Sequence, residues 1–164
     1  MNIALMAHDN KKELMVQFCT AYAGILSRHT LCATSVTGKM VSEASGLPIH
    51  LFMARIHGGA EQIGARIAYN EIDMVLYFCD PNNPQYNESL TYITKLCDQN
   101  NIPFATNLAT AEMLIMGLSR GDLDWRDIVN PKTKPFTTER QKRVFLNTVS
   151  NFNLPIYKQE WILP

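Results

Sequence analysis

Short apolar runs alternate along the chain with stretches in which apolar residues recur at helical spacing. Five of these runs have the length and apolar content of buried strands, and they cover residues 2–7, 31–34, 48–53, 73–79 and 102–106. The stretches between them predict helices over 9–27, 41–44, 61–68 and 90–98. Strands that alternate with helices typically form a parallel sheet covered on both faces. The pattern therefore predicts an α/β fold with a five-stranded parallel sheet.

One domain accounts for most of the chain, because 164 residues with 46% hydrophobic content suit a single sizeable core. The composition changes after Asp127, where Asn-Pro-Lys-Thr-Lys-Pro begins a polar tail punctuated by proline. We place the core domain at 1–129 and a C-terminal extension at 130–164. Residues 138–149 have the pattern of a basic helix, and we expect the extension to pack on the core or on a neighbouring subunit.

The charge balance argues against partners that bind through a broad electrostatic field. The chain has 15 basic and 15 acidic residues, so neither nucleic acid nor a membrane is expected as a partner, and any anion must be bound locally. No segment approaches the ~20 apolar residues of a membrane span. The N-terminus lacks the features of a signal peptide, and these observations together predict a cytoplasmic protein.

The cysteines indicate a reducing environment rather than a metal centre. Cys19, Cys32, Cys79 and Cys97 stand at wide spacings in apolar segments, without a CxxC pair or a nearby set of histidines. This pattern predicts buried thiols, with no metal and no other cofactor.

Candidate chemistry lies where the predicted strands end, because ligands of open parallel sheets bind outside the carboxyl ends of the strands. After the first strand come His8, Asp9 and Lys12. Asp9 can cap the next helix, and Lys12 then lies one turn in, directed back toward the free amides, which suits an anion. A capping aspartate followed by solvated lysines is the alternative.

The second strand leads into a run of hydroxyl groups at a helix start. Thr34, Ser35, Val36 and Thr37 precede Gly38, and hydroxyls combined with helix-start amides can bind several phosphate oxygens. The segment is not a P-loop, because it lacks that motif's glycine spacing and its Gly-Lys-Ser/Thr ending. An ordinary capped turn remains the alternative.

The third strand is followed by a pair of glycines with positive charge nearby. Gly58 and Gly59 precede a helix and would let the backbone approach a ligand, while Arg55 and His57 add cationic side chains. The alternative is a flexible turn with exposed basic residues.

Polar residues also follow the last two predicted strands. Asp80 is a carboxylate at the carboxyl end of a strand, hence either a general base or a loop organiser that accepts backbone amides. Asn107 is more typical of a helix cap than of a ligand contact.

The chain resembles the methylglyoxal synthases over residues 1–129. The matching stretches are IALMAHDNKKELM, CATSVTG, ASGLPI, GGAEQIGA, YFCDP, NIPFATNLATAEMLI and LDWRDI. The resemblance implies a three-layer, flavodoxin-like α/β domain that assembles into a homohexamer. It also implies the reaction of that family, in which dihydroxyacetone phosphate is converted into methylglyoxal and inorganic phosphate.

Carried over position by position, the resemblance retains the binding part of the site. His8 and Lys12 would contact the substrate, residues 34–37 would cradle the phosphate, and Asp80 matches an acid of the family.

The departures from the family lie where its chemistry takes place. Ala60 occupies the position at which the family's catalytic aspartate follows the Gly-Gly pair, and Ala54-Arg55 replaces a Ser-Gly phosphate contact. Tyr86 and Ser89 align with a histidine and an aspartate of the loop after the fourth strand, and Val36 replaces a threonine.

These departures predict a site that binds its ligand with little catalysis. Alanine cannot accept a proton. The side chain of Glu61, one residue further on, points ~100° away from that of residue 60 around a helix, so it cannot simply take the place of the aspartate. Tyr86 could donate a hydrogen bond where the histidine would, but a phenol with a pKa of about 10 is a poor proton shuttle. Arg55 either fills the phosphate site or selects a more highly charged ligand.

We therefore expect a small phosphorylated metabolite, such as dihydroxyacetone phosphate, or inorganic phosphate as the ligand, with lyase activity weak or lost. An active methylglyoxal synthase that uses Glu61 or Asp80 as a relocated base is the alternative. A purely structural assembly protein would leave His8, Lys12 and the threonine loop without a purpose.

Overall fold

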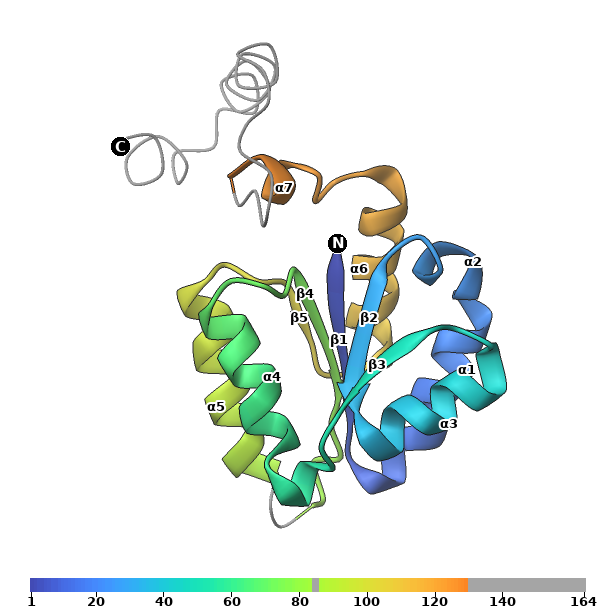
Figure 1. Cartoon of the computed structure of the whole chain (residues 1–164), viewed down its shortest axis with the longest axis vertical. Helices are drawn as coiled ribbons and strands as arrows, with labels where there is room; N and C mark the ends of the chain where they lie inside the picture. Colours follow the sequence, from blue (N-terminus) through green and yellow to red (C-terminus); the bar gives the residue numbers. More distant parts are fainter. Residues whose placement is uncertain (84–85, 130–164) are drawn as a thin grey trace. The chain divides into compact units, whose positions relative to one another are not determined.

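The computed structural model describes residues 1–83 and 86–129 (Figure 1). A first compact unit spans Met1–Arg120, and a second begins at Gly121. The predicted extension 130–164, with the helix expected at 138–149, lies outside the described residues. The predicted domain boundary after residue 129 therefore stays a prediction.

The first unit is built on a single parallel sheet. Its strands are β1 (Asn2–Ala7), β2 (Thr30–Thr34), β3 (Ile49–Phe52), β4 (Met74–Phe78) and β5 (Phe104–Ala105). They lie in the order β3-β2-β1-β4-β5, and every pairing is parallel. The predicted five-stranded parallel sheet is thus confirmed.

Helices cover both faces of this sheet. The helices of the first unit are α1 (Lys12–Ala21), α2 (Ala23–Leu26), α3 (Ser35–Ser45), α4 (Gly59–Ala68), α5 (Tyr86–Gln99) and α6 (Leu108–Arg120). Two short 3-10 turns, η1 (Asp9–Lys11) and η2 (Arg55–His57), precede α1 and α4. Helix α7 (Trp125–Val129) belongs to the second unit. Helices α4 and α5 lie on one face, and α1 and α3 on the other (Figure 1). On the latter face, Tyr22 Oη at the end of α1 donates a hydrogen bond to Glu112 of α6. The expected three-layer, flavodoxin-like architecture is confirmed.

Several helical segments differ from the sequence-based expectation, among them α7 (Trp125–Val129), which was not predicted, and α5, which begins at Tyr86 rather than at 90. The helix expected over 9–27 is divided into η1, α1 and α2, with a break at Tyr22. Helix α3 begins at Ser35 rather than at 41, because its early hydroxyl and glycine residues are weak helix formers that tertiary packing overrides. Helix α6 was not predicted, since its apolar residues are spread around its circumference instead of forming a stripe.

The core of the unit lies along the two central strands. Every residue of β4 is buried, and so is every residue of β1 after Asn2. Helix α4 contributes Ala60, Ile63 and Ile67 to the same buried cluster. The two buried strands therefore fix the positions of the polar residues that follow their carboxyl ends.

The predicted burial of the cysteine thiols is confirmed. All four cysteines are free and buried, and burial raises the pKa of Cys19 to about 12 and that of Cys79 to about 11. Such thiols remain protonated and unreactive at neutral pH. Among the described residues, no helix has both the length and the apolar character needed to cross a bilayer.

Candidate functional site

The strand order creates a topological switch point between β1 and β4. The chain runs outward from β1 through β2 to β3 and then returns to the other side of β1 to form β4. The segments after β1 and β4 consequently lead to helices on opposite faces, α1 and α5 (Figure 1). Ligands of open α/β sheets bind outside the strand ends at such a point. His8 and Asp80 follow the two strands that flank it.

His8 is buried, with 1% of its surface exposed, and both ring nitrogens are engaged. The backbone N–H of Asp80 donates to Nδ1 (2.9 Å), and Nε2 lies 3.1 Å from the hydroxyl of Tyr77. Because Nδ1 accepts a hydrogen bond, a neutral His8 carries its proton on Nε2 and donates it to Tyr77. Burial lowers the pKa of His8, and the positive charge of Arg55 adds to that effect. The imidazole is therefore a neutral link between β1 and β4.

Asp80 organises the loop that follows β4. Its carboxylate accepts hydrogen bonds from the backbone N–H of Asn82 and from the side-chain amide of Asn10, both at 3.0 Å. Its carbonyl accepts a further bond from the N–H of Asn83 (3.1 Å). The bonds from Asn82 and Asn10 lower the pKa of the Asp80 carboxyl, since they favour its charged form. This geometry is that of a loop organiser, whereas the general-base role stays a prediction.

Asp9 does not cap the helix, contrary to the expectation from the sequence. The side chain of this exposed residue pairs with Lys12 Nζ at 2.5 Å, and neither η1 nor α1 has a side-chain cap at its N-terminus. The ion pair forms because a 3-10 turn aligns side chains three positions apart, so that Lys12 reaches back over the turn to Asp9. The hydrogen bond and charge of Lys12 lower the pKa of Asp9.

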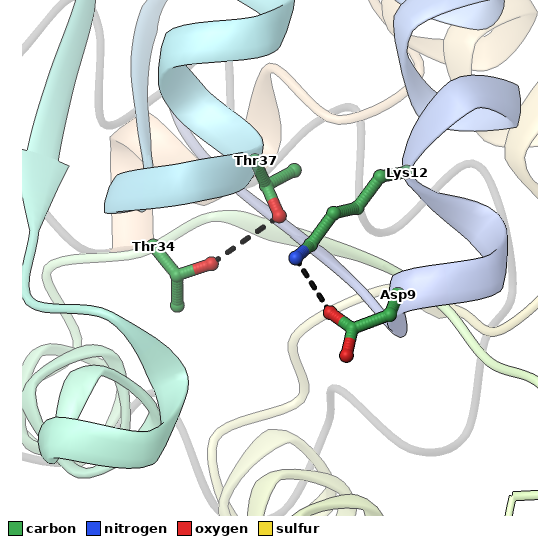
Figure 2. Close-up of polar contacts among 4 residues, drawn as sticks. All are labelled: Asp9, Lys12, Thr34 and Thr37. Carbon is green, nitrogen blue, oxygen red and sulfur yellow. Dashed lines mark hydrogen bonds and ion pairs between the residues drawn. The ribbon is translucent and has the colours of Figure 1, made fainter.

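The hydroxyls of Thr34 and Thr37 gather at the start of α3. Both residues are buried, and the Thr34 hydroxyl donates to Thr37 Oγ1 at 3.4 Å. Thr34 is the N-cap residue, but its hydroxyl does not cap the helix. Figure 2 shows the Lys12 ammonium extending from α1 toward the Thr37 hydroxyl. An ammonium group thus points toward a pair of hydroxyls at a helix start, and these are groups that can bind an anion.

The two residues between the threonines contribute differently. Ser35 is partly buried, and its backbone N–H donates to the carbonyl of Met53 (3.3 Å) after β3. Val36 has an exposed side chain without polar groups, so only its backbone amide can serve an anion.

The glycine pair after β3 shapes a tight loop. Gly58 adopts a left-handed conformation (φ 91°), which glycine tolerates best. A Cβ atom on Gly59 would lie 2.1 Å from the carbonyl oxygen of Met53, so a side chain cannot be accommodated there. Within this loop Arg55 is half-buried and His57 exposed. The charge of Arg55 contributes to lowering the pKa of His8 and Asp9, which follow β1.

The remaining candidates belong to helices α4 and α5 or directly precede α6. Ala60 is 3% exposed and belongs to the core cluster, whereas Glu61 is exposed, as the ~100° step along a helix predicts. Tyr86 is the first residue of α5, and its side chain lies outside the described part of the structure. Asn107 caps α6 as expected, since its side-chain oxygen accepts the N–H of Thr110 at 3.0 Å.

Sequence reasoning missed Tyr77 and Asn10. Tyr77 is fully buried, yet its hydroxyl bonds to His8, and burial raises the pKa of this phenol. A single hydroxyl within the apolar run MVLYF was a usable signal, because a buried tyrosine hydroxyl usually has a partner. Asn10 gave no such signal, since asparagine is common in turns.

The chain was compared with known proteins. Residues 14–106 match the family model described as MGS-like domain. Proteins named methylglyoxal synthase are similar: that of Caldicellulosiruptor saccharolyticus is 59% identical over 133 residues, which cover 80% of this chain and 94% of the relative. That of Oceanobacillus iheyensis is 52% identical over 133 residues, covering 80% of this chain and 95% of the relative.

A solved structure agrees with these relatives. The crystal structure of methylglyoxal synthase from Elizabethkingia anophelis has a TM-score of 0.65 and 38% sequence identity, and the match covers 70% of this chain and 76% of that one. With the predicted sheet, the matched family model and relatives above half identity in agreement, the chain belongs to the methylglyoxal synthase family.

Proposed function

We propose that this protein binds a small phosphate ester, such as dihydroxyacetone phosphate, or inorganic phosphate, and that its lyase activity is weak or lost. The observation that carries the proposal is that the Lys12 ammonium points toward the Thr37 hydroxyl, which is paired with that of Thr34 at the start of α3 (Figure 2). Ammonium and hydroxyl groups donate hydrogen bonds to phosphate oxygens, and the helix start adds backbone amides and a favourable dipole.

Asp9 tunes this site. Its carboxylate pairs with Lys12 and places the ammonium, but it also offsets the positive charge. Asp9 is exposed, so an incoming phosphate can displace it from the lysine without leaving a buried charge unpaired.

The lyase reaction needs groups that this site lacks in suitable form. A base must remove the proton from the carbon that bears the hydroxyl, the enediolate must be stabilised, and the C–O bond must break as phosphate leaves. Ala60 offers no base, His8 has both ring nitrogens engaged, and the hydrogen bonds of Asp80 make its carboxylate a weaker base. A missing base costs about 10²- to 10⁴-fold in rate.

An active methylglyoxal synthase is the second candidate. The names of the relatives favour it, since methylglyoxal synthases share up to 59% of the aligned residues with this chain. In that case Glu61, at the first turn of α4, or Asp80 would serve as the base.

One experiment separates the two candidates. Binding of dihydroxyacetone phosphate is measured by calorimetry, and methylglyoxal release is followed against the spontaneous background. Replacing Lys12 by alanine should weaken binding by more than roughly tenfold, because a charged hydrogen-bond donor is lost. The unmodified protein should release methylglyoxal slowly or not above background. Ala60→Asp should raise release by at least ~10-fold, since a base is restored.

Matched variants control for unspecific effects. Lys95→Ala removes an exposed lysine from α5 and should leave binding unchanged. Ala60→Asn resembles the aspartate in shape without being a base, and should not raise release. Rapid turnover by the unmodified protein that is lost in Glu61→Gln or Asp80→Asn would reject the proposal and establish that carboxylate as the base.

We also propose a homo-oligomer, a hexamer by family resemblance, that resides in the cytoplasm. The buried free thiols fit a reducing compartment, and the balanced charge fits a protein without nucleic acid or membrane partners.

A further inference from the structure

Arg55 stands at the first position of η2, immediately after the end of β3. The turn is closed on the carbonyl of Ala54, which accepts the N–H of His57 (2.9 Å) and that of Gly59 (3.1 Å). Because Gly59 also contacts the backbone of Met53, the loop cannot swing outward without losing this packing. The position of Arg55 is therefore set by the backbone around it.

Among the side chains that the structure describes, no carboxylate forms an ion pair with Arg55. The ion pairs among the side chains of residues 1–83 and 89–128 join Lys12 with Asp9 and Arg66 with Glu71. Arg55 is nevertheless half-buried, which makes its charge more effective than that of a fully solvated arginine.

The charge of Arg55 acts toward the centre of the sheet. It lowers the pKa of His8 and Asp9, which follow β1, and also acts to lower that of Tyr77 on β4, although burial raises the pKa of this phenol overall. These groups lie at the switch point, whereas Thr34 and Thr37 lie at the start of α3. The N–H of Ser35, the first residue of α3, donates to the carbonyl of Met53, two residues before Arg55, so the start of α3 and the turn that carries Arg55 are neighbours.

We propose that Arg55 makes the site selective for phosphate esters that carry a second anionic group, either a carboxylate or a second phosphate. The inference rests on the proposed function, since Lys12, Thr34 and Thr37 bind the first phosphate. A planar guanidinium donates two parallel hydrogen bonds to a carboxylate or phosphate, which a hydroxyl at the same place cannot accept equally well.

Calorimetry with two matched esters tests this selectivity. Glycerol 3-phosphate and 3-phosphoglycerate share the phosphate and a three-carbon chain. At the end opposite the phosphate, the first carries a hydroxymethyl group and the second a carboxylate. The unmodified protein should bind 3-phosphoglycerate at least ~10-fold more tightly, as expected for one charge-assisted pair. Arg55→Gln should bring the two affinities to within about twofold of each other, and Arg55→Lys should restore part of the preference. Propane-1,3-diol bisphosphate should share the preference of 3-phosphoglycerate if the site accepts a second phosphate.

Arg28→Gln is the matched control, because Arg28 is exposed and precedes β2, at the amino end of the strand rather than at the carboxyl end where the proposed site lies. It should leave the preference intact. Equal affinity of the unmodified protein for the two esters, or a preference that survives Arg55→Gln, would overturn the role of Arg55. If neither ester nor inorganic phosphate binds, the proposed function itself fails, and that outcome is distinct from binding without preference.

Discussion

At the scale of single residues, His8 shows how the fold changes the chemistry of a side chain. It follows a strand as a candidate ligand contact, yet it is buried between Tyr77 and the backbone of Asp80. Its hydrogen bonds join groups that are 69 and 72 positions away in the chain. A histidine in this setting contributes to stability through its neutral form.

The lowered pKa of His8 predicts acid sensitivity. The unfolded chain, in which the histidine pKa is about 6.5, binds a proton more readily than the folded protein, so stability falls as pH drops below that value. Protonation would also put a hydrogen on Nδ1 of His8, which would then face the backbone N–H of Asp80 instead of accepting its hydrogen bond. The free energy of unfolding in urea should therefore fall more steeply between about pH 7.5 and about pH 5.5 in the unmodified protein than in His8→Gln.

His57→Gln provides the comparison for this measurement, since His57 is exposed and its replacement should leave the pH profile unchanged. If the unmodified protein and His8→Gln lost stability equally over this range, His8 would not be the titrating group.

At the scale of elements, the end of β3 connects the two helix starts that face the site. The N–H of Met53 donates to the side chain of Gln62 on α4 (2.8 Å), and its carbonyl accepts the N–H of Ser35 at the start of α3 (3.3 Å). Gly59 packs on the same carbonyl. The glycine loop and the threonine segment are thus one connected structure.

Gly59→Ala should therefore be destabilising. The new Cβ atom would lie 2.1 Å from a backbone oxygen, which cannot move without disturbing β3, so the expected loss is about 1–3 kcal/mol or more. Thermal unfolding measures it. Because α3 is connected through Met53, phosphate affinity should weaken as well.

Gly24→Ala is the matched control, because a Cβ atom at Gly24 has no neighbour within 4 Å. Alanine there should be neutral or stabilising by about 0.4–1 kcal/mol. A Gly59→Ala protein as stable as Gly24→Ala would show that the loop relaxes freely.

At the scale of the whole molecule, the edge strand β3 leaves apolar side chains uncovered. Leu51 on the strand, Met53 just after it and Ile56 in η2 are exposed, the last at 78%. Exposed edge strands and contiguous apolar surface are commonly covered by a partner. This surface supports the proposed assembly of several copies.

Light scattering should accordingly give a mass about six times the 18.6 kDa of the chain if the proposed hexamer forms. Leu51→Glu should lower that mass, because a charge on the edge of β3 opposes pairing. Tyr69→Glu, at the exposed end of α4, should not. A monomer at micromolar concentration would contradict the prediction.

Much of the fold follows from the order of residues alone. Strand position depends on runs of apolar residues and helix position on their spacing, both of which are local, so the five strands and most helices could be derived. The cap at Asn107 and the burial of the cysteines follow from equally local chemistry. The candidate site residues, and Ala60 where the resemblance implies an acid, are likewise visible in the sequence.

Other features depend on which distant surfaces are buried together. The strand order, the partnership of His8 with Tyr77 and the effect of the Arg55 charge on His8 leave no trace in local spacing. Asp9 pairs with Lys12 rather than capping a helix because the 3-10 turn, which local propensity does not predict, brings the two side chains together. Tertiary packing selects among local alternatives of similar free energy, and at this site those selections determine which groups are available to a ligand.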